Sequence, residues 1–177
     1  MNPLKVGVAG FGTIGVPVAR ALDHGIDGLE LVAVCTRTPE KAKARMAAFR
    51  RAVPVVEAPE LARRAEVVVE CVPKEAFMTV ARPAVEAGRI LITVSAAGIL
   101  GNPGIVDLAK AHGGRIILAT GALLGLDAVR AAAEGTIRSV TMVTRKPPKS
   151  LKGAPYLIEH GIGIDGLNGP KKLFEGS

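Results

Sequence analysis

The sequence has little of what several classes of protein need. Its 177 residues include no Trp and only 3% aromatic residues, which argues against a protein that stacks nucleic-acid bases and against aromatic-lined sugar or peptide grooves. No uncharged apolar run reaches the roughly 18 residues that suggest a membrane-spanning helix. We therefore expect neither a nucleic-acid partner nor a membrane partner.

Cysteine is also scarce. Cys35 and Cys71 stand far apart and form no CxxC pair, so a structural metal is not expected. The N-terminus lacks the basic start, apolar run and cleavage site of a signal peptide. Together these features predict a reducing, cytoplasmic location. The net charge of +7 favours anionic partners, but does not choose among cofactor phosphate, substrate carboxylate and nucleic acid.

The first 120 residues alternate short apolar runs with helical patterns. Strands are predicted over residues 4–9, 29–35, 53–56, 67–71, 90–95 and 115–119, and helices over residues 16–22, 73–87 and 102–112. Thr38 and Pro39 predict a further helix start, as N-cap and first helical residue. Continuous apolar strands, such as the three Val at 67–69, are typical of a parallel sheet buried on both faces. The sequence predicts an α/β fold with a doubly wound, Rossmann-type parallel sheet.

The pattern changes after residue 121. A helix over residues 124–134 and a longer strand over 136–144 are predicted. We expect residues 1–121 to form an NAD(P)-binding Rossmann domain, and residues 122–177 to begin a second α+β substrate or dimerisation domain that stops short. The segment 138–152 holds five basic residues and no acidic one, which suits either a dicarboxylate substrate or a solvated edge.

One glycine-rich turn is the main candidate for binding a dinucleotide. Its six residues are Gly10, Phe11, Gly12, Thr13, Ile14 and Gly15, a GxGxxG between a predicted strand and a predicted helix. Gly10 allows the tight turn, Gly12 lets a pyrophosphate approach the backbone, and Gly15 lets helix and strand pack closely. The helix N-terminus offers N–H groups to phosphates. The alternative is a glycine turn without a ligand.

The end of the second strand bears on which dinucleotide binds. An NAD-preferring site usually has an acidic residue there, whereas this chain has Thr36 and Arg37. Arg37 suits a 2′-phosphate, and Lys41 follows one helical turn later. We expect NADP or NAD, with NADP favoured; a solvated basic helix face is the alternative.

Two more turns are candidates because ligands of such sheets bind at the carboxyl ends of strands. They contribute Cys71, Val72, Ser95 and Ala97 as expected cofactor contacts. Cys35 and Cys71 should end strands on opposite sides of the first strand, too far apart for a disulfide.

Three His are present, and two of them, His24 and His112, are expected at the surface. His160 is the remaining candidate for proton transfer. No Ser/His/Asp constellation or metal-ligand cluster is visible.

Three segments resemble the L-aspartate dehydrogenase family. They are Gly-Ala-Leu-Leu-Gly-Leu-Asp at 121–127, Arg-Lys-Pro-Pro-Lys-Ser-Leu at 145–151 and Phe-Glu-Gly-Ser at 174–177. The resemblance implies that L-aspartate is oxidised with NAD or NADP to iminosuccinate, which hydrolyses to oxaloacetate and ammonia or feeds NAD biosynthesis. It also implies a homodimer at full length and a cofactor contact at Ala122.

The family's catalytic His has no counterpart in this sequence, so no catalytic residue is assigned and the chain alone is expected to bind cofactor without turnover. The ending at Ser177, a helix-start residue, suggests a truncated chain. Two alternatives stay open. One is another NAD(P)-dependent enzyme of the homoserine dehydrogenase or dihydrodipicolinate reductase type. The other is a non-catalytic dinucleotide-binding module.

Overall fold

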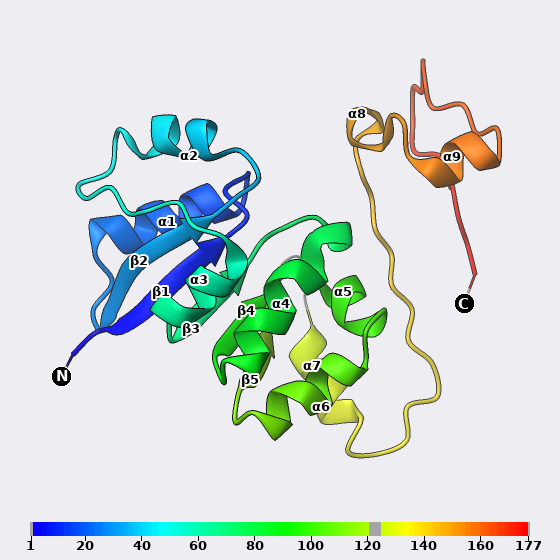
Figure 1. Ribbon diagram of the computed structural model, residues 1–177. Coiled ribbons are helices and arrows are strands. Elements are labelled where there is room, and N and C mark those ends of the chain that lie inside the picture. The colour runs from blue at the N-terminus through cyan, green and yellow to red at the C-terminus, as the bar shows by residue number, and fades with distance from the viewer. Residues whose placement is uncertain (1, 121–124, 177) are drawn as a thin grey trace. The chain divides into compact units, whose positions relative to one another are not determined.

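The computed structural model describes residues 2–120 and 125–176 (Figure 1). The chain divides into two compact units, Met1–Leu126 and Asp127–Ser177. The first unit contains a parallel sheet of five strands in the order β2-β1-β3-β4-β5. The strands are β1 (Leu4–Ala9), β2 (Leu29–Cys35), β3 (Val67–Glu70), β4 (Ile90–Thr93) and β5 (Arg115–Leu118).

Helices cover both faces of this sheet. They are α1 (Gly15–His24), α2 (Pro39–Met46), α3 (Ala58–Arg64), the 3-10 turn η1 (Lys74–Ala76), α4 (Phe77–Glu86), α5 (Ala96–Leu100) and α6 (Gly104–Ala111). Helices α1 and α2 bury their apolar residues on one face, whereas α3, α4 and α6 pack on the other. The predicted doubly wound fold is confirmed, because the sheet is parallel and helices pack against both of its faces.

The last residues of the five strands pair with one another in register across the sheet. Ala9 of β1 pairs with Cys35 of β2 and with Glu70 of β3. Glu70 pairs with Thr93 of β4, which pairs with Leu118 of β5. The turns that follow these strands therefore share one edge of the sheet, the edge where ligands of such folds bind.

The strand predicted over residues 53–56 is wrong. Only a single bridge forms, between Val34 and Val55, flanked by hydrogen bonds from Val34 N to Pro54 O and from Val56 N to Val34 O. Pro54 has no N–H to donate, so a ladder cannot continue through it. The sequence reasoning also missed α3 directly after this segment, and α5, where a turn was expected.

Helix α2 begins as predicted. Thr38 is its N-cap residue and Pro39 its first residue, although the Thr38 side chain makes no capping hydrogen bond. Ala42 and Met46 of α2 are buried, and Phe49, just beyond the helix, continues the same apolar face.

The second unit is built from short helices: α7 (Leu126–Ala132), α8 (Pro148–Leu151) and α9 (Pro155–Glu159). The strand predicted over residues 136–144 is wrong, since no strand forms there. Val140, Met142 and Val143 are exposed by 63%, 68% and 80%. A strand needs a neighbour for its N–H and C=O groups, and the described residues of this unit provide none.

Candidate dinucleotide-binding site

The glycine turn links β1 to α1 and is tightly packed at its two ends. A Cβ atom at Gly10, whose φ is +90°, would stand 2.3 Å from the carbonyl oxygen of Cys71. A Cβ atom at Gly15 would stand 1.8 Å from the carbonyl oxygen of Gly10. Both distances are far below van der Waals contact, so only glycine fits either position.

Gly12, between them, has open space. A Cβ atom there would meet no described heavy atom within 4 Å. Helix α1 starts just after it without a side-chain cap and without an acidic residue in its first turn. The N–H groups of Val16 and Val18 already donate to the carbonyls of Gly12 and Ile14, so an anion would meet the N–H groups of the turn itself and the positive end of the helix dipole. A turn that is closed at Gly10 and Gly15 and open at Gly12 fits the pyrophosphate of a dinucleotide.

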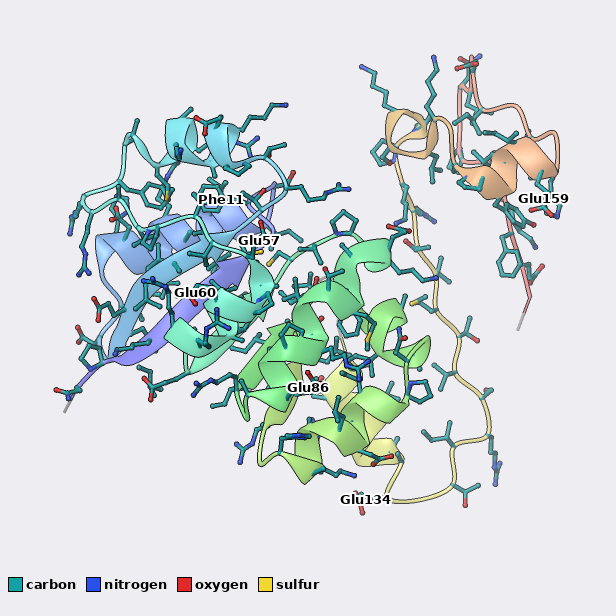
Figure 2. The ribbon with its side chains drawn as sticks, in the orientation of Figure 1. Phe11, Glu57, Glu60, Glu86, Glu134 and Glu159 are labelled. Atoms are coloured by element: carbon teal, nitrogen blue, oxygen red, sulfur yellow. The ribbon has the colours of Figure 1, made fainter. Side chains whose placement is uncertain are left out.

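Phe11 is buried, unlike the three residues that follow it in the turn. Its side chain is only 4% exposed and packs beside Phe49, with 6.1 Å between ring centroids (Figure 2). The guanidinium of Arg45 in α2 donates a hydrogen bond to the Phe11 carbonyl oxygen. Phe11 thus offers a ligand only its backbone, while Gly12, Thr13 and Ile14 are exposed.

The basic residues after β2 divide into two groups. Lys43 pairs with Glu40, Arg51 pairs with Glu30, and both Arg45 and Arg50 donate to backbone carbonyls. The side chains of Arg37 and Lys41 make no hydrogen bond or ion pair with any residue that the structure describes. Of the six basic residues between positions 37 and 51, Arg37 and Lys41 are therefore our candidates for a 2′-phosphate.

An acidic group also stands close to the end of β2. Burial, and then the charge of Glu57, raises the pKa of the Cys35 thiol to about 11. Glu57 is the residue before α3 (Figure 2), and its distance along the chain hid it from the sequence reasoning. Charges of both signs thus border the place where the adenosine ribose is expected.

Both cysteines are free, as predicted. Burial, and then the charge of Glu70, raises the pKa of Cys71 to about 11 as well. Neutral, half-buried thiols are poor nucleophiles. The backbone of these residues is what touches the turn: Gly10 N donates to Cys35 O at 2.8 Å, and Cys71 N donates to Ala9 O at 2.7 Å.

Val72 and Ser95, on the turns after β3 and β4, come together around one buried carboxylate. Val72 N donates to Glu70 Oε1 at 2.7 Å, and Ser95 Oγ donates to the same oxygen at 3.2 Å. Ala97 lies exposed in the first turn of α5. The sequence reasoning missed Glu70 and its partner Thr93; a charged residue at the end of an apolar strand was the available signal.

The remaining residues that the sequence singled out are the three His and Ala122. His24 and His112 are exposed at helix ends, each bonded to the carbonyl four residues earlier. His160, in the second unit, stacks on Tyr156 with 4.1 Å between ring centroids. Ala122 lies outside the described residues.

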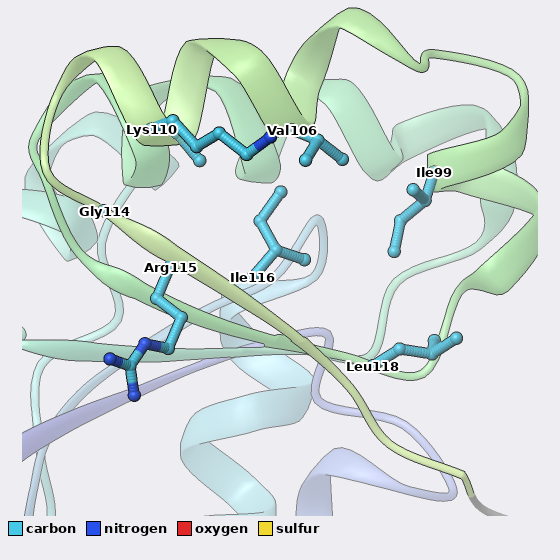
Figure 3. A pocket seen from close by; sticks show the side chains of 8 residues that line it. Ile99, Val106, Lys110, Gly114, Arg115, Ile116 and Leu118 are labelled. Carbon is cyan, nitrogen blue, oxygen red and sulfur yellow. The ribbon is translucent and has the colours of Figure 1, made fainter. Parts of the chain in front are cut away.

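A separate hollow of about 330 Å³ lies between α6 and the edge strand β5 (Figure 3). Its lining contains Ile99, Val106, Ile116 and Leu118 and none of the predicted site residues. In the described ranges no group of His, Cys, Asp and Glu could hold a metal ion. In the same ranges no helix is both long and apolar enough to cross a membrane.

The sheet, its glycine turn and the open space at Gly12 define a Rossmann-type dinucleotide-binding domain of the dehydrogenase class. Residues 10–119 match the family described as the NAD binding domain of homoserine dehydrogenase, and residues 127–177 match the C-terminal domain family of aspartate dehydrogenase. The chain belongs to the L-aspartate dehydrogenase family.

Individual relatives agree with this assignment. The chain is 50% identical over 176 residues to an L-aspartate dehydrogenase of Bradyrhizobium diazoefficiens, covering 99% of this chain and 62% of that protein. It is 45% identical to L-aspartate dehydrogenase 3 of Bordetella bronchiseptica, covering 98% of this chain and 64% of that protein. The chain thus spans less than two thirds of the length of these relatives.

Among solved structures, the WlbA dehydrogenase from Bordetella pertussis, in complex with NADH and UDP-GlcNAcA, superposes with a TM-score of 0.58. It is 25% identical, and the match covers 75% of this chain and 42% of that one.

Proposed function

We propose that this chain is the cofactor-binding part of an NAD(P)-dependent L-aspartate dehydrogenase. The observation that carries the proposal is the glycine turn, closed at Gly10 and Gly15 and open at Gly12. The aspartate-type match over residues 127–177 favours L-aspartate over homoserine as substrate.

In this proposal the backbone of residues 10–15 holds the pyrophosphate at the start of α1. Thr36 and Arg37 face the adenosine end, with Arg37 and Lys41 as the cations for a 2′-phosphate. Cys71, Val72, Ser95 and Ala97 line the nicotinamide side, and Ala122 is assigned there by family resemblance alone.

When bound, a nicotinamide dinucleotide supplies the hydride acceptor. In the proposed reaction L-aspartate would give a hydride from Cα to that acceptor and release a proton from its amino group to solvent, and so become iminosuccinate. The basic segment 138–152 is our candidate for meeting the two substrate carboxylates, because it has five cationic side chains and no acidic one. We also propose that the domains divide near residue 121 and that the full-length protein is a homodimer. We further propose a reducing, cytoplasmic location, which the two free thiols support.

Calorimetric titration of the chain with NADP and with NAD, at one salt concentration, tests cofactor binding. We expect a dissociation constant on the order of micromolar for at least one of them. Absence of binding to both would overturn the proposal. Substrate is tested separately at full length, by following formation of the reduced nicotinamide with L-aspartate and, as a comparison, with L-homoserine; turnover with homoserine alone would overturn the choice of aspartate.

A further inference from the structure

Glu70 is a carboxylate where the fold would accept an apolar side chain. It ends the run Val-Val-Val-Glu of β3 and, like Thr93 beside it on β4, is 0% exposed. No Lys, Arg or His among the described residues forms an ion pair with it. Burying an unpaired carboxylate costs free energy that an apolar residue of similar size would not, so a stabilising role does not account for it.

The hydrogen bonds of Glu70 explain its presence better. On the β3 side, its Oε1 accepts the N–H of Val72 at 2.7 Å. On the β4 side, Oε1 accepts from Ser95 Oγ at 3.2 Å, and Oε2 accepts from the Thr93 hydroxyl. Thr93 Oγ1 in turn accepts the N–H of Ser95 at 2.9 Å. One carboxyl group thus ties together the turns that follow two neighbouring strands.

The same network reaches the glycine turn through the backbone. Residue Cys71, between Glu70 and Val72, presents the carbonyl that a Cβ atom at Gly10 would strike. Its N–H is bonded to Ala9 at the end of β1. A shift of the turn after β3 would therefore move the Cys71 carbonyl against Gly10, where backbone atoms already fill the space.

We infer that Glu70 is a positioning residue that fixes the turns after β3 and β4 in the shape required for the dinucleotide. Glu70 does so as a fully buried residue behind these turns, without contacting the ligand. This inference rests on the proposed function, since those two turns matter only if a dinucleotide lies against them.

The test compares three variants at positions 70 and 68. Glu70→Ala removes every acceptor, whereas Glu70→Gln keeps one oxygen for Val72 N–H and places an amide nitrogen that can donate to Thr93 Oγ1. Val68→Ala is the matched control, because Val68 is 1% exposed, lies on the same strand and points to the same face two residues earlier. Melting temperature and the dissociation constant of NADP and NAD are measured for each on the 177-residue chain.

We expect Glu70→Ala to weaken dinucleotide binding by about tenfold or more, as for loss of a charge-assisted network. Glu70→Gln should restore binding to within about threefold of the original chain. Val68→Ala should melt at a lower temperature and bind as the original chain does. A general loss of stability would instead weaken binding in Val68→Ala as well.

Amide resonances provide a readout that does not depend on the ligand. Glu70→Ala should shift the amide signals of both Val72 and Ser95. Thr93→Val removes the two β4-side bonds that involve the Thr93 hydroxyl, to Glu70 and from Ser95 N–H, so it should shift Ser95 and leave Val72 in place.

Two failures are distinguishable. If the original chain binds and Glu70→Ala binds within about twofold of it, or if its Val72 and Ser95 amides do not move, the positioning role is overturned while the proposed function stands. If the original chain binds neither dinucleotide, the proposed function fails and the inference falls with it.

Discussion

Replacing single glycines of the β1–α1 turn by alanine separates the binding role of the turn from its packing role. Gly12→Ala adds a methyl group to empty space, at a position whose φ is not positive. Gly15→Ala adds the same group 1.8 Å from the Gly10 carbonyl oxygen. The two substitutions are chemically identical, and the structure predicts opposite outcomes.

The magnitudes follow from those surroundings. Gly12→Ala should not disturb the folded state, and it reduces the conformational entropy of the unfolded chain. The free energy of unfolding should therefore stay constant or rise by up to about 1 kcal/mol. At Gly15 the backbone must move by more than 1 Å to reach a tolerable contact, which points to the upper end of the usual overpacking cost, about 3 kcal/mol. For a chain of this size that lowers the melting temperature by roughly 6–12 °C.

Binding should respond in the reverse order. The Gly12→Ala methyl group occupies the space proposed for the pyrophosphate, so the dissociation constant for NADP and NAD should rise at least about tenfold, or 1.4 kcal/mol. Calorimetric titration and thermal denaturation of the same samples measure both quantities. Gly104→Ala is the control, because Gly104 also has open space and begins a helix, but lies far along the chain at α6.

A Gly12→Ala chain that binds dinucleotide as tightly as the original would refute the reasoning. So would a Gly15→Ala chain that melts at the original temperature, because the packing argument would then be wrong.

Three further predictions concern the rest of the first unit. Arg37→Ala should weaken NADP binding by about tenfold and leave NAD binding unchanged. Arg51 is already paired with Glu30, so Arg51→Ala should change the binding of neither cofactor. Equal losses of NADP and NAD binding in Arg37→Ala would contradict a 2′-phosphate role. Because the pKa values of Cys35 and Cys71 are raised from 9.0 to about 11, their contribution to stability is present below pH 9 and is lost as pH rises towards 11. Denaturant titrations across that range should show the decline, and it should be shallower when both are replaced by Ala. Leu61→Ala, at a fully buried α3 position, should lower the unfolding free energy by about 2–5 kcal/mol; a smaller loss would mean that α3 packs loosely on the sheet.

The glycine turn and the buried sheet were predictable because their signals are local. A GxGxxG between an apolar strand and a helix specifies backbone shape residue by residue, and runs such as the three Val of β3 cannot be placed at a surface. The expectation that the strands ending near Cys35 and Cys71 lie on opposite sides of the first strand also holds, since β2 and β3 flank β1.

The misses have physical reasons. The segment around Pro54 has an apolar strand pattern, but its ladder is stopped by one missing N–H. Residues 136–144 have a strand pattern too, yet pairing depends on a neighbour that no local pattern reveals. Glu70 and Glu57 escaped notice because their roles arise from residues distant in sequence: Ser95 for the first and Cys35 for the second.

The attachment of Phe11 to α2 limits how cofactor preference can change. The ring of Phe11 shares its core with Ala42, Met46 and Phe49, and its carbonyl is held by Arg45. We therefore expect substitutions on the inner face of α2 to disturb the glycine turn as well. Only the outward residues after β2 are free to vary independently, so engineers who wish to switch this scaffold between dinucleotides should confine their libraries to those positions.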